Sequence, residues 1–82
     1  MEYEYLFTKS LFEKLKDRIK AKVFCKVYDN VLAIEINTRE GVQYRKYIPD
    51  FAAEIGNGLN ADMVSDDVVR EYKKVVLQHY FH

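Results

Sequence analysis

The chain has 82 residues, of which 49% are hydrophobic and 15% are aromatic, and its 13 basic and 13 acidic side chains cancel. This length allows one domain with one core, and the composition excludes a disordered chain, which would combine low hydrophobicity with high net charge. The balanced charge argues against a protein whose main task is to coat nucleic acid, because a large basic excess supplies the affinity of such proteins.

The cysteine count and the N-terminal residues indicate a compartment. Cys25 is the one cysteine, so no intrachain disulfide can form, and a reducing compartment is favoured for so small a domain. The N-terminus has neither the basic region nor the apolar region of a signal peptide. No apolar run approaches the roughly 18 residues that a membrane span needs. We therefore expect a cytoplasmic protein that does not contact a membrane.

The first twenty residues contain two different patterns. Residues 2–7 alternate aromatic with other side chains, which predicts either an extra strand or an extended tail over the core, and both interpretations stay open. Ser10-Leu11-Phe12-Glu13 has the form of a capping box, and Leu15 and Ile19 follow at helical spacing. The sequence therefore predicts a helix over residues 10–20, with one apolar stripe and a basic back.

The next segment alternates as a β-strand does. Val23, Cys25 and Val27 are expected to point to the core, and Asp29-Asn30 can form a two-residue hairpin loop because both residues tolerate positive φ. Counting outward from this loop pairs Val27 with Leu32, Cys25 with Ile34 and Val23 with Ile36. All six apolar side chains then share one face, as a correct register requires.

A second turn, Arg39-Glu40-Gly41, suits a three-residue loop with glycine in the left-handed position. The register that follows pairs Ile36 with Tyr44 and Leu32 with Ile48 on the inner face, and Glu35 with Arg45 on the outer face. Lys46 falls opposite Ile34 on the inner face. A lysine can extend from an edge strand to solvent, so the third strand is predicted at an edge and ends at Pro49.

The last third of the chain predicts two helices. Asp50 is expected to cap a short helix through Phe51 and Ile55, which ends at Gly56-Asn57-Gly58. Asn60 or Asp62 is expected to begin the longest helix. Its predicted apolar stripe consists of Val64, Val68, Tyr72, Val75 and Val76, closed by Phe81. The predicted fold is α+β, a three-stranded antiparallel meander with helices packed on one face, in the order α-β-β-β-α-α, as a single domain over residues 1–82.

No catalytic, cofactor or metal site is predicted. Cys25 is expected to face the core, where a thiol behaves as a small hydrophobe. His79 and His82 have a spacing that places two ligands on one helical face, but no cysteine or carboxylate cluster completes a metal set. Gly56 and Gly58 follow a helix rather than a strand and indicate a turn, not a dinucleotide site. We expect a protein that is not an enzyme and needs no cofactor.

Two groups of side chains are candidates for contacting a partner. The predicted register gathers aromatic and basic residues on the outer sheet face, namely Lys22, Phe24, Lys26, Tyr28, Arg45 and Tyr47. Such a composition is typical of single-stranded nucleic-acid platforms and of protein interfaces. Burial under a helix or under the N-terminal segment is the simplest interpretation, and a protein is favoured over nucleic acid as a partner.

The second group belongs to an acidic segment, residues 50–67, which contains no base, whereas bases outnumber acids in residues 9–26. Asp62, Asp66 and Asp67 could compete with phosphates for a basic groove, because both satisfy the same Lys and Arg donors. Helix capping and the helix dipole are the simpler explanation of these carboxylates.

Several stretches resemble short, mostly uncharacterised proteins of phages and prophages of Gram-positive bacteria. These stretches are Asp29-Asn30-Val31-Leu32, Val42-Gln43-Tyr44, residues 55–59, and residues 68–72 with Tyr80-Phe81. The order α-β-β-β-α-α is also similar to that of a small phage-encoded anti-CRISPR inhibitor of a DNA-cutting nuclease. The resemblance implies a phage- or prophage-encoded binding protein that contacts a macromolecule in the host cytoplasm, with a defence nuclease as the candidate target.

Two alternatives stay open beside this interpretation. One is a small nucleic-acid-binding regulator that uses the basic first helix and the cations of the sheet. The other is a structural or self-assembling component, in which residues 3–7 pair edge to edge in a dimer. The chain is accordingly expected to be a monomer or a homodimer, with a protein as the favoured partner.

Overall fold

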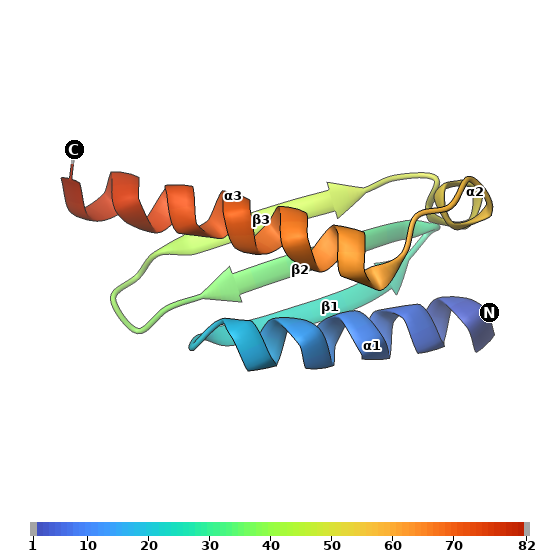
Figure 1. Cartoon of the computed structure of the whole chain (residues 1–82), viewed down its shortest axis with the longest axis horizontal. Coiled ribbons are helices and arrows are strands. Elements are labelled where there is room, and N and C mark those ends of the chain that lie inside the picture. The colour runs from blue at the N-terminus through green and yellow to red at the C-terminus, as the bar shows by residue number, and fades with distance from the viewer. Residues whose placement is uncertain (1, 82) are drawn as a thin grey trace.

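The three strands form one antiparallel sheet, in which they lie in the order of the sequence. The computed structural model describes residues 2–81, without the side chain of Glu2. Its elements are α1 (Glu2–Arg18), β1 (Lys22–Tyr28), β2 (Val31–Asn37), β3 (Gln43–Ile48), α2 (Phe51–Gly56) and α3 (Ala61–Phe81), as Figure 1 shows. The predicted fold class, a meander with the order α-β-β-β-α-α, is confirmed.

The register of the sheet is the predicted one throughout. Asp29 and Asn30 have φ of 52° and 58°, so the β1–β2 hairpin turns through two left-handed residues, whose twist suits the flanking strands. Cys25 pairs with Ile34 on one side of the meander, and Ile36 pairs with Tyr44 on the other. Gly41 has φ of 87°, as expected for the left-handed position of the second turn.

Helix α1 begins much earlier than predicted. Residues 2–7 are neither a strand nor an extended tail, because they form the first turns of α1. Phe7 is buried and lies one helical repeat before Leu11 and Leu15, so the apolar stripe extends to the N-terminus. Ser10 lies inside the helix and therefore caps nothing. The helix ends at Arg18, although the next residue, Ile19, still donates its N–H to the carbonyl of Leu15 at 2.9 Å.

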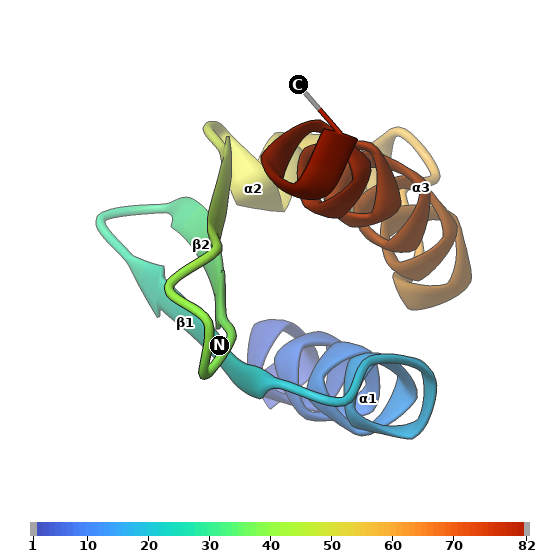
Figure 2. The ribbon, with the colours of Figure 1, turned by 90° about the vertical axis from the view of Figure 1, so that its left-hand side faces the viewer.

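Both long helices cover the same face of the sheet, and Figure 2 shows this arrangement end-on. The core between them and the sheet is fully closed at its centre. The side chains without any exposed surface include Leu11, Leu15, Leu32, Ile34, Ile36, Phe51 and Val68. At the hairpin end, Phe51 of α2 packs edge-to-face on Phe7, with ring centroids 4.9 Å apart. Across residues 2–81, no helix is both long enough and apolar enough to cross a membrane.

Of the two C-terminal helices, α2 is capped by a different residue from the predicted one, whereas α3 begins where it was predicted to begin. Asp50 occupies the N-cap position of α2 with φ of 53°, but its side chain makes no capping hydrogen bond within the described residues. Asn30 of the hairpin replaces it. The Asn30 Oδ1 accepts the N–H of Ala52 at 2.9 Å, and the Asn30 carbonyl accepts the N–H of Phe51 at 2.9 Å. Helix α3 begins as predicted after Asn60, whose Oδ1 accepts the N–H of Met63 at 2.9 Å.

The apolar stripe of α3 is correct at its start and wrong at its end. Val64 and Val68 are buried, as is Val69, which was not among the predicted residues. Phe81 is 81% exposed and closes nothing, because α3 extends past the end of the sheet (Figure 1).

A polar cluster joins β3 to α3 and explains the inward lysine. Tyr44 donates its hydroxyl to Glu71 Oε1 at 2.5 Å, and Lys46 Nζ donates to the two carboxylate oxygens at 3.2 and 3.3 Å. The hydrogen bond from Tyr44 lowers the pKa of Glu71, against the effect of burial, and Lys46 lowers it further. Burial and then the hydrogen bond to Glu71 raise the pKa of Tyr44. Lys46 thus has a charged partner on the inner face.

The Asn30 cap predicts a destabilised variant. Replacing Asn30 with Ala removes the acceptor for Ala52 and puts at this positive φ a residue that tolerates the left-handed region less well than asparagine, and each change costs about 1 kcal/mol. We expect urea unfolding, followed by circular dichroism, to show a free energy of unfolding lower by about 2 kcal/mol. Asn30→Gly, which tolerates the positive φ, should lose only about half of that. Equal stability of Asn30→Ala and the unaltered chain would contradict this account.

The Glu71 cluster predicts a pH dependence of stability. Because the pKa of Glu71 is lower in the folded state than in the unfolded state, its carboxylate stabilises the fold above its unfolded pKa. This stabilisation is lost as the pH falls below about 5 and passes through the lowered pKa. The free energy of unfolding of Glu71→Gln should therefore fall less between pH 6 and about pH 3 than that of the unaltered chain.

Glu35→Gln is the matched control for this measurement, since Glu35 has an ion pair to Arg45 at 3.2 Å but no hydrogen bond from a tyrosine. The pH profile of this control should follow that of the unaltered chain. If Glu71→Gln gives the same profile as Glu35→Gln, the cluster does not contribute to the acid dependence.

Candidate binding surface

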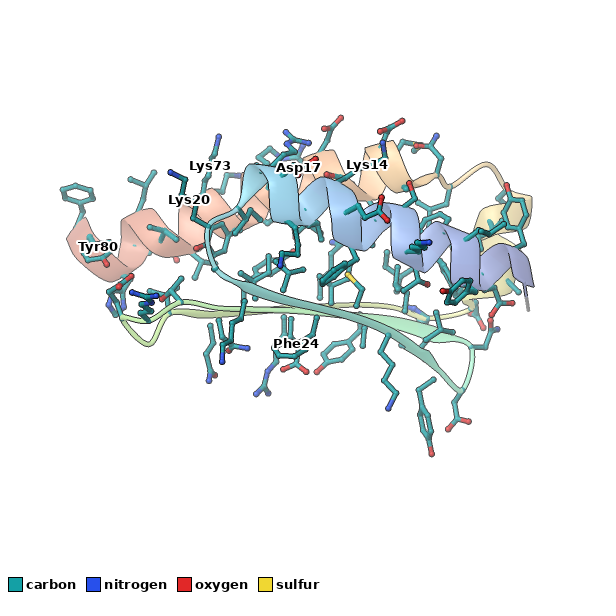
Figure 3. All side chains as sticks on the ribbon, turned by 90° about the horizontal axis from the view of Figure 1, so that it is seen from below. Lys14, Asp17, Lys20, Phe24, Lys73 and Tyr80 are labelled. Atoms are coloured by element: carbon teal, nitrogen blue, oxygen red, sulfur yellow. The ribbon has the colours of Figure 1, made fainter. Side chains whose placement is uncertain are left out.

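The outer face of the sheet is open to solvent. The side chains of Phe24, Tyr28 and Tyr47 are 55%, 68% and 57% exposed. Figure 3 shows Phe24 pointing away from both long helices. Burial of this face under a helix or the N-terminal segment was therefore a wrong interpretation, because α1, which contains that segment, packs on the opposite face. The structure brings together the six predicted outer-face residues: Lys22, Phe24, Lys26, Tyr28, Arg45 and Tyr47.

The centre of this face is small and apolar, and its border is aromatic and charged. The register places Ala33 between Lys26 and Tyr47, in the middle of the sheet. One row further, Glu35 lies between Phe24 and Arg45 and forms the ion pair to Arg45. Since alanine has a short side chain, the neighbouring rings stand above the centre of the face. Lys26 Nζ lies 5.7 Å from the ring centroid of Tyr28, within the range of a cation–π contact.

Unpaired positive charge continues from this face to one end of the sheet. A hollow of about 780 Å³ is lined there by Lys20, Lys22 and Arg39, together with Glu40 and neighbouring residues. None of these three cations forms an ion pair with a residue in the described part of the chain. Lys22 belongs to both the hollow and the outer face. The sheet side of this electrically neutral protein is therefore cationic.

The predicted acidic residues lie elsewhere and have partners. Asp62 binds Lys14 at 2.9 Å and Asp66 binds Arg18 at 2.6 Å, so the start of α3 is paired with the basic side of α1. Asp67 pairs with Arg70 of its own helix at 2.9 Å. The basic and acidic segments of the sequence are thus complementary surfaces of two neighbouring helices. The structure does not bring these carboxylates together with the outer face of the sheet.

A groove that sequence reasoning missed lies between α1 and β1. It has a volume of about 540 Å³, and its lining residues are Glu4, Tyr5, Thr8, Lys9, Phe12, Cys25, Lys26 and Val27. The groove was missed because half of its wall belongs to the N-terminal residues, which were not predicted to be helical. The i, i+4 spacing of Phe7 and Leu11 is the signal that could have revealed this helix.

Cys25 is half-buried and lines the groove. Burial raises the pKa of its thiol to about 11. The thiol is consequently protonated at neutral pH and is a poor nucleophile.

Two other predicted residues concern metal binding. Among residues 2–81, no group of three or more His, Cys, Asp or Glu side chains is placed to hold a metal ion. The ring of His79 packs edge-to-face against Tyr80 with centroids 5.1 Å apart. His82 lies outside the described residues.

The raised pKa of Cys25 predicts slow alkylation. At pH 8, iodoacetamide should modify Cys25 at least about a hundredfold more slowly than it modifies glutathione, because so little thiolate is present. The rate should rise about tenfold per pH unit up to about pH 9.5 without levelling. Mass spectrometry of timed samples measures this rate, and unfolding in urea should remove the difference. Alkylation of the folded protein as fast as that of glutathione would show an exposed, ionised thiol.

Comparisons of the chain with protein-family models, with curated proteins and with solved structures gave no significant match.

Proposed function

We propose that this chain is a non-enzymatic binding protein that recognises a protein partner through the outer face of its sheet. The observation that supports this proposal most directly is the exposure of Phe24, Tyr28 and Tyr47 on a face that no described helix covers. Aromatic side chains in solvent have an unfavourable hydration that contact with a partner removes, and Tyr and Arg are enriched among residues that dominate binding energy.

The chemistry of the face defines the partner that fits it. Its centre is apolar around Ala33, and Lys22 and Lys26 border it without carboxylate partners among the described residues. A complementary surface therefore has an apolar centre bordered by Asp or Glu side chains. The resemblance to phage and prophage proteins extends the proposal to a host protein in the bacterial cytoplasm. A defence nuclease as that target stays a prediction, since no residue of the face distinguishes one acidic protein from another.

Single-stranded nucleic acid is the second candidate partner, and the hollow at the end of the sheet favours it. The unpaired cations Lys20, Lys22 and Arg39 can contact phosphates, while the exposed rings offer stacking surfaces for bases. On the basic side of α1, Lys14 and Arg18 are already paired with carboxylates of α3. Self-assembly through residues 3–7 as an edge strand loses its basis, because these residues are helical.

The test combines capture with a measured affinity. Immobilised full-length chain is exposed to host lysate, and each captured protein is purified and titrated by calorimetry against the double variant Phe24→Ala/Tyr47→Ala. We expect this variant to weaken binding by at least about thirtyfold, as the loss of two aromatic contacts in an interface does. Its stability should change by less than about 1 kcal/mol, because both rings are more than half exposed.

The matched control is Tyr3→Ala/Tyr80→Ala, which removes two rings of similar exposure, 65% and 55%, from elsewhere on the surface. This control should bind as the unaltered chain does. Equal affinities of the two double variants would exclude the outer face as the interface. Binding to a labelled oligonucleotide that falls steeply between about 50 and 200 mM salt, with no protein partner, would instead favour nucleic acid.

A further inference from the structure

Strand β1 has a free edge whose backbone groups can be assigned. In a hairpin with a two-residue loop, the residues that flank the loop, Tyr28 and Val31, exchange backbone hydrogen bonds. The bonded pairs alternate along the strand, so the N–H and C=O groups of Val23, Cys25 and Val27 point away from β2. In the described part of the chain, these outward groups make no hydrogen bond. The edge therefore offers a row of donors and acceptors to an additional strand.

The two edges of the sheet differ in how they are protected. Edge strands of soluble proteins are usually blocked by proline, a bulge or an inward-pointing charge. Strand β3 has two of these devices, the inward charge of Lys46 and Pro49 at its end. Strand β1 is a regular strand from residue 22 to residue 28, with every residue paired to β2, and its lysines point to the outer face. The β1 edge is open to pairing.

The groove between α1 and β1 lies along this same edge. Figures 1 and 2 show α1 running beside β1 for the length of the strand. Tyr5 and Phe12 of α1 face Cys25 and Val27 of β1 across the groove. The side chains of an added strand alternate between its two faces. Those on the helix side would enter this mostly apolar groove, and those on the other side would lie next to Lys22 and Lys26.

We infer that the free edge of β1 pairs with an extended segment of a protein partner, whose inward side chains are aliphatic and whose outward side chains are acidic. This inference rests on the proposed function, because it takes the partner to be a protein. Charge decides the outward residues, since Lys22 and Lys26 lie on the outer face beside this edge and neither has an ion-pair partner among residues 2–81. A second copy of the chain fits less well, because it presents a strand with lysines and places its own α1 at the same groove.

The first test uses a nine-residue peptide that alternates valine with glutamate and has blocked ends. Amide hydrogen exchange, followed by NMR, is measured on the full chain with and without the peptide. In the free protein the amides of Val23, Cys25 and Val27 should exchange fast, and the peptide should slow them by about tenfold or more. The amides of Phe24 and Lys26, which already bond to β2, should change little. A peptide that alternates valine with lysine should give no protection.

Proline at position 25 tests the backbone directly. Cys25→Pro removes the outward N–H and leaves the hydrogen bonds to β2 in place, and proline is tolerated where an edge-strand N–H faces solvent. Cys25→Val is the matched control, because it removes the thiol and retains the N–H. We expect the proline variant to bind the glutamate peptide about tenfold more weakly than the valine variant.

A side-chain pair keeps the inference testable if the proline variant does not fold. Tyr5→Ala removes one wall of the groove, whereas Tyr3→Ala removes a ring of the same 65% exposure outside it. Only Tyr5→Ala should weaken the binding of the glutamate peptide. The edge inference is overturned if the lysine peptide binds equally, if proline and valine at position 25 are equivalent, or if no peptide protects the β1 amides.

The same measurements separate this inference from the proposed function. If Phe24→Ala/Tyr47→Ala abolishes partner binding and the position-25 variants do not affect peptide binding, the outer face is the interface and the edge inference fails. If the edge amides become protected and the double variant retains full affinity for the partner, the edge inference stands and the outer face is not the interface.

Discussion

The turn at Asp29-Asn30 is the constraint on which the rest of the structure depends. Two consecutive residues with positive φ close the hairpin with no spare residue, so the direction of every side chain in β1 and β2 follows from it. A slip of one residue would place Phe24 on the same face as Ile34 and Leu32, so either Phe24 would enter the core or the two β2 side chains would face solvent. The same turn extends beyond the sheet, because Asn30 holds the first two N–H groups of α2. That contact places Phe51 over Phe7 and closes the core at the hairpin end.

The charged side chains of this protein are distributed unevenly between the helix side and the outer face of the sheet. The carboxylates at the start of α3 are paired with cations of α1, and Glu71 is paired with Lys46. These pairs are partly exposed, so each contributes little to stability, but they neutralise three carboxylates on the helix side of the sheet. Lys22 and Lys26 of the outer face, and Lys20 and Arg39 of its end hollow, form no ion pair among the described residues. A formal net charge of zero therefore coexists with a cationic binding surface.

The sequence predicted those features that depend on local pattern. Period-two alternation and a two-residue loop determined the register, and the register alone identified the outer-face residues correctly. The prediction from sequence failed at the N-terminal segment, where two periodic patterns fit the same residues. Tyr3, Tyr5 and Phe7 alternate as in a strand, but Phe7 also continues the helical stripe of Leu11 and Leu15. The helix buries Phe7 in the core and satisfies the backbone hydrogen bonds of this segment within the segment itself.

Contacts between residues far apart in the sequence could not be predicted, for a different reason. The contact between Lys46 and Glu71 joins residues 25 positions apart, and the cap from Asn30 to Ala52 joins residues 22 apart. Each depends on how two elements dock, which local propensity does not specify. The groove between α1 and β1 was missed on the same ground, because one wall comes from a segment whose helical state decides whether the groove exists.

In strand β1, the residues that stabilise the fold and the residues available for recognition lie on opposite faces of the same segment. Its inward residues Val23, Cys25 and Val27 pack toward the core, while Phe24, Lys26 and Tyr28 contact solvent. Changes on the outer side therefore leave the folding energy nearly intact, since little buried area is lost. Strand β3 lacks this separation: its inner side includes Tyr44 and Lys46, which hold α3 through Glu71. A surface that can vary without unfolding the domain is a property expected of a recognition site, and in this fold β1 has it on its outer face and along its free edge.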